Sequence, residues 1–151
     1  MSSDTDPVRG HSGEKATRRL DRERLERIRR FAGAPAEVAG DHLYELDKQW
    51  DIERKLEANA ATIMLLTTAL AATHSKRWLV LAAVVPGFLL QHAIQGWCPP
   101  IEAFRRLGAR SRNEIDAERT AIKALRGDFA GLPDPAAPQA AEQALQAAGR
   151  R

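Results

Sequence analysis

The sequence has few of the residues that build catalytic and metal centres. Its 151 residues include one cysteine, Cys98, so an intramolecular disulfide is excluded and an oxidising compartment is not indicated. The four histidines are scattered, and none lies at ligand spacing from the cysteine or from another histidine. The sequence also lacks a Ser/His/Asp arrangement and a glycine-rich phosphate loop. We therefore expect no metal, no cofactor and no enzymatic activity.

Charge is absent from two long stretches, although 28% of all residues are charged. Asp, Glu, Lys and Arg are missing from residues 58–75 and again from residues 78–101, and only Lys76 and Arg77 separate the two stretches. The flanks are nearly balanced, with 12 basic and 13 acidic residues before the first stretch and 9 basic and 7 acidic residues after the second. Because balanced flanks leave no basic footprint, nucleic acid is not an expected partner.

The two uncharged stretches have the length of membrane-spanning helices. Eighteen helical residues extend about 27 Å, close to the ~30 Å thickness of the hydrocarbon core. The second stretch is longer and more apolar, and we expect Pro86 and Gly87 to kink it. The connection at residues 74–77 is long enough only for antiparallel neighbours. The predicted fold class is all-α, a membrane-spanning two-helix antiparallel hairpin with flanking cytoplasmic helices, and the lipid bilayer is the expected partner.

The alternative is that this hairpin forms the buried centre of a soluble bundle. The flanking helices have narrow apolar stripes, however, and would have to cover two helices that are apolar on all sides. Eight basic residues lie within 20 residues of the outer ends of the spans, against Lys76 and Arg77 in the turn. The positive-inside bias therefore predicts cytoplasmic termini. Trp78 and Trp97 lie at opposite ends of the second span, where interfacial indoles are common.

The flanks are predicted to be helical between irregular ends. The predicted segments, in order, are a disordered tail at 1–17, charged cytoplasmic helices at 18–57, the two-helix transmembrane hairpin domain at 58–108, a cytoplasmic amphipathic helix at 109–129, and a linker with an Ala/Gln-rich tail at 130–151. Asp41 is expected to cap a helix that runs unbroken into the first span. A capping box at 111–114 and Gly127 should bound the amphipathic helix. Acidic residues in the flanks are expected on solvated faces.

Small and polar residues share one face of the second span. Ala83, Gly87, Gln91 and Gln95 recur every four residues, which predicts a helix–helix contact or a contact between copies of the chain. Ala61, Thr68 and Ala72 offer a matching small face on the first span. A path for a small anion between hairpins is the alternative.

His92 lies beside Gln91 and Gln95 as a third polar residue at membrane depth, where polar side chains usually face protein or water. It could ligate a haem or a metal ion only if a second copy completed the ligand set. The absence of a Cys/His cluster argues against such a centre.

Cys98 is the candidate reactive thiol. The pair Pro99-Pro100 is expected to end the second span and open a short helix, which Gly108 ends. Cys98 would then be the N-cap of that helix, where the helix dipole and free amides favour a thiolate. The alternative is that Cys98 is a small apolar residue at an interface.

The exit of the second span resembles a known bacterial family. Gly87, the run Gln95-Gly96-Trp97-Cys98-Pro99 and the pair Leu107-Gly108 resemble the transmembrane domain of YgaP-like inner-membrane proteins, a two-helix domain of unknown function. The family motif falls on Gly96, Cys98, Pro99, Leu107 and Gly108, and the resemblance covers residues 55–108. It implies the bacterial inner (cytoplasmic) membrane, cytoplasmic termini and self-association.

The resemblance does not extend to the family namesake's rhodanese domain, because residues 1–57 contain no cysteine and no α/β pattern. The expected function is a self-associating membrane anchor or scaffold of unknown biochemical role. The alternative is a membrane-bound thiol protein that uses Cys98 in persulfide handling or redox sensing.

Overall fold

The computed structural model describes residues 6–149, and all regular elements in that range are helices. The helices are α1 (Pro7–Gly10), α2 (Glu14–Phe31), α3 (Ala36–Lys48), α4 (Ile52–Thr73), α5 (Trp78–Gln95), α6 (Pro100–Arg106), α7 (Arg112–Arg126) and α8 (Ala140–Gly149). Their described residues form two compact units, the hairpin unit of residues 6–20 and 50–112 and the charged unit of residues 21–49 and 113–149. The prediction of an all-α chain is confirmed.

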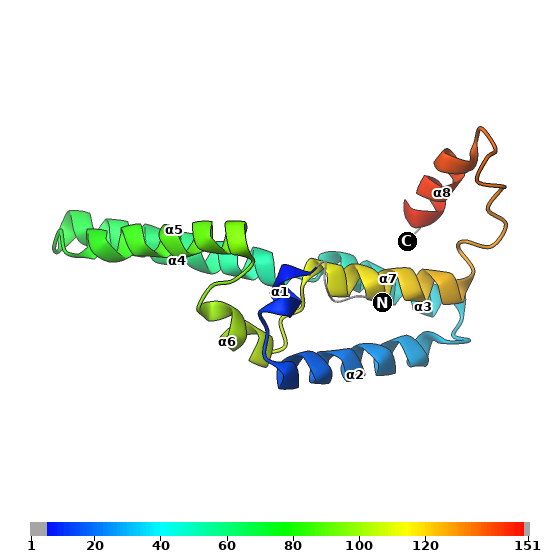
Figure 1. Ribbon diagram of the computed structural model, residues 1–151, viewed down its shortest axis with the longest axis horizontal. Helices are drawn as coiled ribbons and strands as arrows, with labels where there is room; N and C mark the ends of the chain where they lie inside the picture. Colours follow the sequence, from blue (N-terminus) through cyan, green and yellow to red (C-terminus); the bar gives the residue numbers. More distant parts are fainter. Residues whose placement is uncertain (1–5, 150–151) are drawn as a thin grey trace. The chain divides into compact units, whose positions relative to one another are not determined.

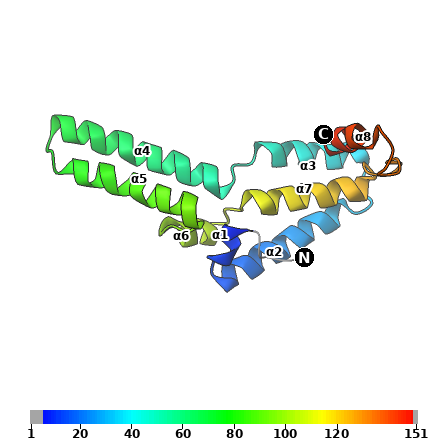
Figure 2. The ribbon, with the colours of Figure 1, turned by 45° about the horizontal axis from the view of Figure 1, so that its top comes forward.

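Two apolar helices, α4 and α5, pack side by side in opposite directions in the hairpin unit (Figures 1 and 2). Helix α4 begins after Asp51, whose carboxylate accepts the backbone N–H of Arg54 at 2.8 Å. Helix α5 runs through Pro86 and ends at Gly96, which adopts a left-handed φ of 70°. The second span, predicted to end at Pro99-Pro100, is therefore helical only to Gln95 before the chain turns. Both helices are long and apolar enough to cross a membrane.

The apolar surface of these helices is largely uncovered. One stripe of α4, including Leu56, Ala60 and Thr67, is buried, whereas α5 has no buried residue. Val80, Leu90 and Ile94 of α5 remain 67%, 62% and 75% exposed. Within the hairpin unit, the other helices therefore leave α5 largely uncovered.

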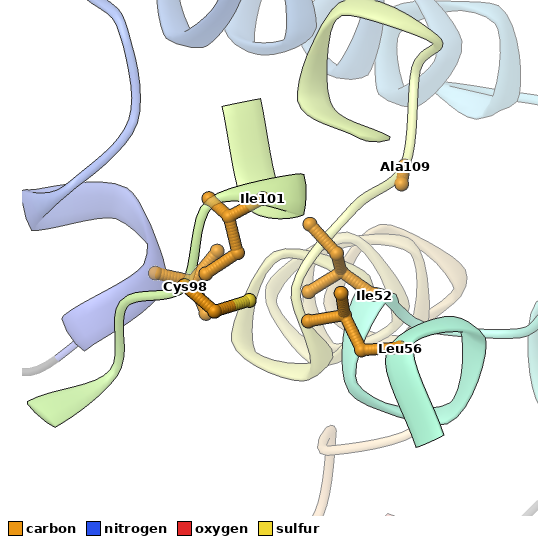
Figure 3. Close-up of a cluster of buried hydrophobic side chains, with 6 residues drawn as sticks. Ile52, Leu56, Cys98, Ile101 and Ala109 are labelled. Carbon is orange, nitrogen blue, oxygen red and sulfur yellow. The ribbon is translucent and has the colours of Figure 1, made fainter. Parts of the chain in front are cut away.

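A small core lies at the base of the hairpin, the end opposite the turn at residues 74–77, where α4 begins and α5 ends. Val8 of α1, Ile52 and Leu56 of α4, and Ile101 of α6 pack together with Cys98 and Ala109 (Figure 3). The burial of Val8 corrects the prediction of a disordered tail at 1–17, because its described part holds α1 and the start of α2. Gly96 explains why α1 fits there: a Cβ at Gly96 would lie 2.1 Å from the Cβ of Pro7.

The charged unit has a separate core, to which α2, α3 and α7 contribute. Its buried residues, Ala39, Leu43, Leu46, Ile115 and Ile122, lie on α3 and α7, and Ile28 and Phe31 of α2 pack against them. Figure 2 shows the three helices side by side. Their narrow apolar stripes are sufficient for this small core.

Two predicted helix boundaries in the flanks are wrong. Asp41 does not begin a helix, because α3 starts at Ala36 after Pro35 and Asp41 lies inside it. The helix does not run unbroken into the first span either, because Gln49 is extended and Asp51 begins a new helix. The predicted end near Gly127 is confirmed, since α7 stops at Arg126 and Gly127 has a φ of 86°.

Candidate functional site at the base of the hairpin

Two buried carboxylates, Asp6 and Asp51, bond to the first residues of three helices, α1, α4 and α7. Asp6 caps α1 by accepting the N–H groups of Val8 and Arg9, and it also accepts the hydroxyl of Ser111, which directly precedes α7. Asp51 caps α4 and pairs with Arg112, with 2.6 Å between Nη2 and the carboxylate. Each carboxylate therefore satisfies backbone amides of one helix and holds the beginning of another in place.

Cys98 is buried in the core beside these helix starts. It is 3% exposed, and Figure 3 shows its side chain directed toward Ile52 and Leu56. The predicted N-cap position is wrong, because α6 begins at Pro100 and Pro99 is its cap. Burial raises the pKa of the Cys98 thiol, and the backbone N–H of Ile101 only partly opposes this effect. A buried thiol with a raised pKa is a poor nucleophile. The geometry therefore fits the alternative of a small apolar residue better.

An apolar cavity of about 220 Å³ lies next to Cys98. Its walls include Leu56, Ala60 and Ile63 of α4 and Val85 and Phe88 of α5. With almost no polar surface, this cavity offers van der Waals contacts but no group to fix or activate a polar substrate.

A larger cavity of about 590 Å³ lies at the same end of the hairpin. Glu53 and Glu57 of α4 and His92 of α5 line it, together with mostly apolar residues. The Oε2 atom of Glu53 and the Nδ1 atom of His92 are both buried and have no hydrogen-bond partner among the described residues. Titratable side chains therefore line this cavity, but these two atoms are not accessible from it.

The electrostatic surroundings of Glu53 are unfavourable to its charge. Burial raises the pKa of its carboxyl, and the neighbouring carboxylates of Asp51 and Asp6 raise it further. The backbone amides of Glu53 and Arg112 oppose the shift without cancelling it. The fold therefore favours the protonated form of this carboxyl more than water does.

The predicted face of small and polar residues on α5 is largely exposed. Ala83, Gly87 and Gln95 are exposed, and a Cβ at Gly87 would meet nothing within 4 Å. The amide of Gln91 donates to the side-chain oxygen of Gln95 at 3.4 Å along the same helix. On α4, the predicted matching residues Ala61, Thr68 and Ala72 are exposed too. Within one chain these faces are open, and their predicted contact with another copy stays a prediction.

The residues quoted for the family resemblance shape the exit from α5. Gly96 ends α5 and Pro99 caps α6, while Leu107 caps the other end of α6 and is followed by Gly108 with a φ of 88°. Both glycines have a left-handed backbone that other residues rarely adopt. These residues therefore have local structural reasons to be present, whatever the function of the chain.

Sequence reasoning missed Glu53 and Glu57, which were included among residues expected on solvated faces. Their spacing of four does place them on one face of a helix, and His92 was already identified as polar within the span. What no periodicity could show is that the hairpin turn brings His92 of α5 to the same cavity. The packing of α1 against Gly96, with Pro7 and Val8 in the cavity wall, was equally hidden.

Comparison with known proteins identifies no relative of this chain. No protein-family model matches the chain, and neither the curated proteins nor the solved structures contain a match. The resemblance of residues 55–108 to the YgaP-like domain therefore stays a prediction.

Proposed function

We propose that this protein is a small integral membrane protein whose α4–α5 hairpin spans the bilayer twice and anchors its charged helices in the cytoplasm. The observation that supports it is that α5 has no buried residue although it is mostly apolar and contains no Asp, Glu, Lys or Arg. Exposing such a helix to water is unfavourable by about 25 cal/mol per Å² of apolar surface, whereas lipid covers it without cost.

The distribution of basic residues supports the orientation. Arg105, Arg106, Arg110 and Arg112 follow the second apolar helix closely, and Lys76 and Arg77 alone occupy the turn. Positively charged residues are retained on the cytoplasmic side during insertion. The inner membrane of a bacterium is the location that the resemblance of residues 55–108 favours.

The first test is alkaline carbonate extraction of membranes from cells that express the tagged full-length chain. We expect the protein in the membrane pellet. Its appearance in the supernatant would contradict the spanning hairpin.

A substitution distinguishes a lipid-facing helix from an exposed helix of a soluble protein. Val84 is exposed near the middle of α5. Val84→Lys should disturb insertion, because a lysine at the centre of a span costs roughly 2.5–3.5 kcal/mol. On a water-facing surface the same change would shift stability by no more than about 0.5 kcal/mol. Val84→Leu is the matched control, and equal membrane retention of both variants would count against the proposal.

The orientation can be tested with single cysteines in a Cys98→Ala background. His74→Cys places a thiol in the turn, and Ala144→Cys places one on the exposed surface of α8. A membrane-impermeant maleimide should label the first thiol in intact spheroplasts and the second in inverted vesicles. The reverse pattern would place the termini outside the cytoplasm.

Self-association is the second part of the proposal, and the open face of α5 supports it. Small residues allow close approach of helices in lipid, and side-chain amides can form hydrogen bonds across the contact. Gly87→Leu should reduce the oligomer fraction measured by light scattering in detergent, without disturbing the hairpin, because the space beside Gly87 is open. Leu81→Phe adds bulk to another face of α5 and is the control. A protein that is monomeric before any substitution would contradict this part of the proposal.

A further inference from the structure

The smaller cavity, between α4, α5 and the turn that precedes α6, has walls that suit hydrocarbon. Its lining includes Ala60 and Ile63 of α4, Val85 and Phe88 of α5, and Pro99 of the turn, with almost no polar surface. A cavity of about 150 Å³ lined by Leu, Ile and Phe stays dry and binds benzene. At about 220 Å³, the present cavity has room for a longer apolar group. A polar guest would lose its hydration there without a compensating bond.

The position of this cavity along the hairpin lies within the proposed bilayer. Ala60 and Ile63 belong to the first uncharged stretch, and Val85 and Phe88 belong to the second. Pro99 completes the wall because the chain turns at Gly96 and runs back beside the hairpin before α6 begins (Figures 1 and 2). Acyl chains are the hydrocarbon that surrounds a spanning helix at this depth.

One face of α4 changes from charged to apolar between the base and the cavity. Asn59 lines the cavity, and the partly exposed Lys55 lies one turn nearer the base on the same face, because residues four apart are neighbours on a helix. The carboxylates of Glu53 and Glu57 lie on a different face, where they line the larger cavity. The order along this face is therefore a cation, an amide and hydrocarbon walls. A phospholipid has complementary groups in the same order, namely its phosphate, its ester carbonyls and its acyl chains.

We propose that this cavity binds one acyl chain of a phospholipid from the cytoplasmic leaflet, with the phosphate beside Lys55 and an ester carbonyl accepting the amide N–H of Asn59. The methylenes of a lysine can lie on apolar surface while its ammonium reaches the headgroup level. The inference rests on the proposed spanning hairpin, which brings the cavity and the lipid to the same depth. It adds a specific site, because one lipid is bound per chain while other lipids only surround the exposed faces.

Photo-crosslinking locates the lipid. The full-length protein is reconstituted in phosphatidylcholine nanodiscs that contain phosphatidylglycerol with a diazirine in one acyl chain. We expect crosslinks concentrated at residues 60–63, 85–89 and 99–100. Crosslinks spread evenly over the exposed apolar residues of the hairpin, such as Leu65, Val80 and Leu90, would overturn the site.

Native mass spectrometry of the detergent-solubilised protein tests the role of the phosphate. We expect one phosphatidylglycerol per chain and about fivefold weaker binding of a diacylglycerol with the same acyl chains, since one basic residue contributes about this factor. Lys55→Gln should weaken phosphatidylglycerol binding about fivefold and leave diacylglycerol binding unchanged. Lys76→Gln, at the exposed turn of the hairpin, is the control and should change neither. Unchanged phosphatidylglycerol binding in Lys55→Gln would overturn the headgroup placement.

A matched pair of neighbouring valines tests the cavity itself. Val85→Phe fills the cavity, whereas Val84→Phe adds the same bulk at an exposed position outside it. Val85→Phe should weaken phosphatidylglycerol binding at least about tenfold, the effect of excluding two methylene groups. Val84→Phe should leave binding unchanged. Ile63→Phe fills the same cavity from α4 and keeps the test available if Val85→Phe fails to fold.

Carbonate extraction of the same preparations separates this inference from the membrane proposal. Equal lipid binding by the two valine variants, in a protein that stays in the membrane pellet, would overturn the lipid site and leave the spanning hairpin intact. Release of the wild-type protein into the supernatant would overturn both.

Discussion

The two units of this protein are both helical, yet the hairpin unit leaves the apolar helix α5 exposed and the charged unit buries its apolar stripes. In the hairpin unit the apolar helix α5 has no buried residue, while the carboxylates of Asp6 and Asp51 are buried at the base. In the charged unit, narrow apolar stripes such as Leu43 and Ile122 are buried, and the surface is charged. The difference shows that the narrow stripes of the charged unit suffice for a core of its own, whereas the hairpin unit does not bury α5. The proposed bilayer would cover that helix.

The buried polar groups differ in purpose between the units. In the charged unit, Glu118 is fully buried and accepts three hydrogen bonds from the guanidinium of Arg27, with Nε2 of His42 at 3.1 Å. This network joins α2, α3 and α7. In the hairpin unit, Asp6 and Asp51 instead bond to backbone amides at helix starts. The first arrangement selects which helices pack together, and the second fixes where helices begin.

The largest effect should follow from breaking the network in the charged unit. Glu118→Ala leaves Arg27 and His42 without their common acceptor. We expect a loss of about 3 kcal/mol, at the low end of the range for a broken buried ion pair, because both partners reach water and can rehydrate. Hydrogen-exchange mass spectrometry of the full chain in detergent should show about 100-fold lower protection in α3 and α7, with α4 and α5 unchanged.

Glu45→Ala is the control for this loss, because its pair with Lys48 is exposed and such pairs contribute about 0–1 kcal/mol. If Glu118→Ala and Glu45→Ala have the same protection pattern, the network does not hold the charged unit together. A simultaneous loss of protection in α4 and α5 would show that the two units unfold as one.

The next largest effect should come from the contact between α1 and the exit of α5. Gly96→Ala combines a left-handed backbone with a Cβ that overlaps Pro7, and we expect a loss of about 2 kcal/mol. All three tryptophans belong to the hairpin unit, so the tryptophan fluorescence of a denaturation series reports this unit alone.

Gly10→Ala is the matched control, because a Cβ there would meet nothing within 4 Å and its φ is not positive. Should Gly96→Ala unfold at the same denaturant concentration as Gly10→Ala, α1 is not tightly held against the hairpin. Increased exchange confined to residues 7–12 would mean that α1 is released without damage to α4 and α5.

A smaller effect should follow from removing the cap of α4. Asp51→Ala removes the acceptor for the N–H of Arg54 and the partner of Arg112. We expect a loss of about 1 kcal/mol, the usual cost of an N-cap. Asp41→Ala is the control, because Asp41 lies inside α3 on an exposed face and caps no helix. Equal effects in the fluorescence series would show that the carboxylate of Asp51 does not define the start of α4.

Asp41 and Asp51 also show how far the sequence alone predicts the fold. The two apolar helices, the short helix after Pro99 and the end of α7 at Gly127 were predictable, because they depend on runs, prolines and glycines that act locally. Whether Asp41 or Asp51 caps a helix is not local. Asp51 is selected by its ion pair with Arg112, far along the sequence, and an aspartate followed by apolar residues looks the same in both places.

The packing at the base of the hairpin could not be predicted from the sequence, for a similar reason. Helix α1 has four residues and is too short to be stable alone. It depends on the burial of Val8, on the approach of Pro7 to Gly96, and on the bond from Ser111 to Asp6. Composition marked this segment as a disordered tail because none of these partners is near in sequence.

The smallest effect should be a pH dependence that belongs to the hairpin unit alone. Burial raises the pKa of Glu53 above its ordinary value of 4.5. The folded chain therefore holds this proton more tightly than the unfolded chain does. The stabilisation from Glu53 is full below the ordinary value and is lost as the pH rises through the raised pKa. Wild type should thus be most stable relative to Glu53→Gln at about pH 4, and the difference should shrink or reverse toward neutral pH.

Carboxyls with a lowered pKa lose their stabilising effect as the pH falls, which is opposite to Glu53. Subtracting the unfolding free energy of Glu53→Gln from that of wild type at each pH removes the contribution of such groups. The pKa of Glu102 is lowered by the backbone N–H of Gly13 and by Arg106, so its contribution is lost as the pH falls. Tryptophan-monitored denaturation at several pH values between 4 and 8 measures both variants under the same conditions. A difference that does not change with pH would mean that Glu53 keeps an ordinary pKa.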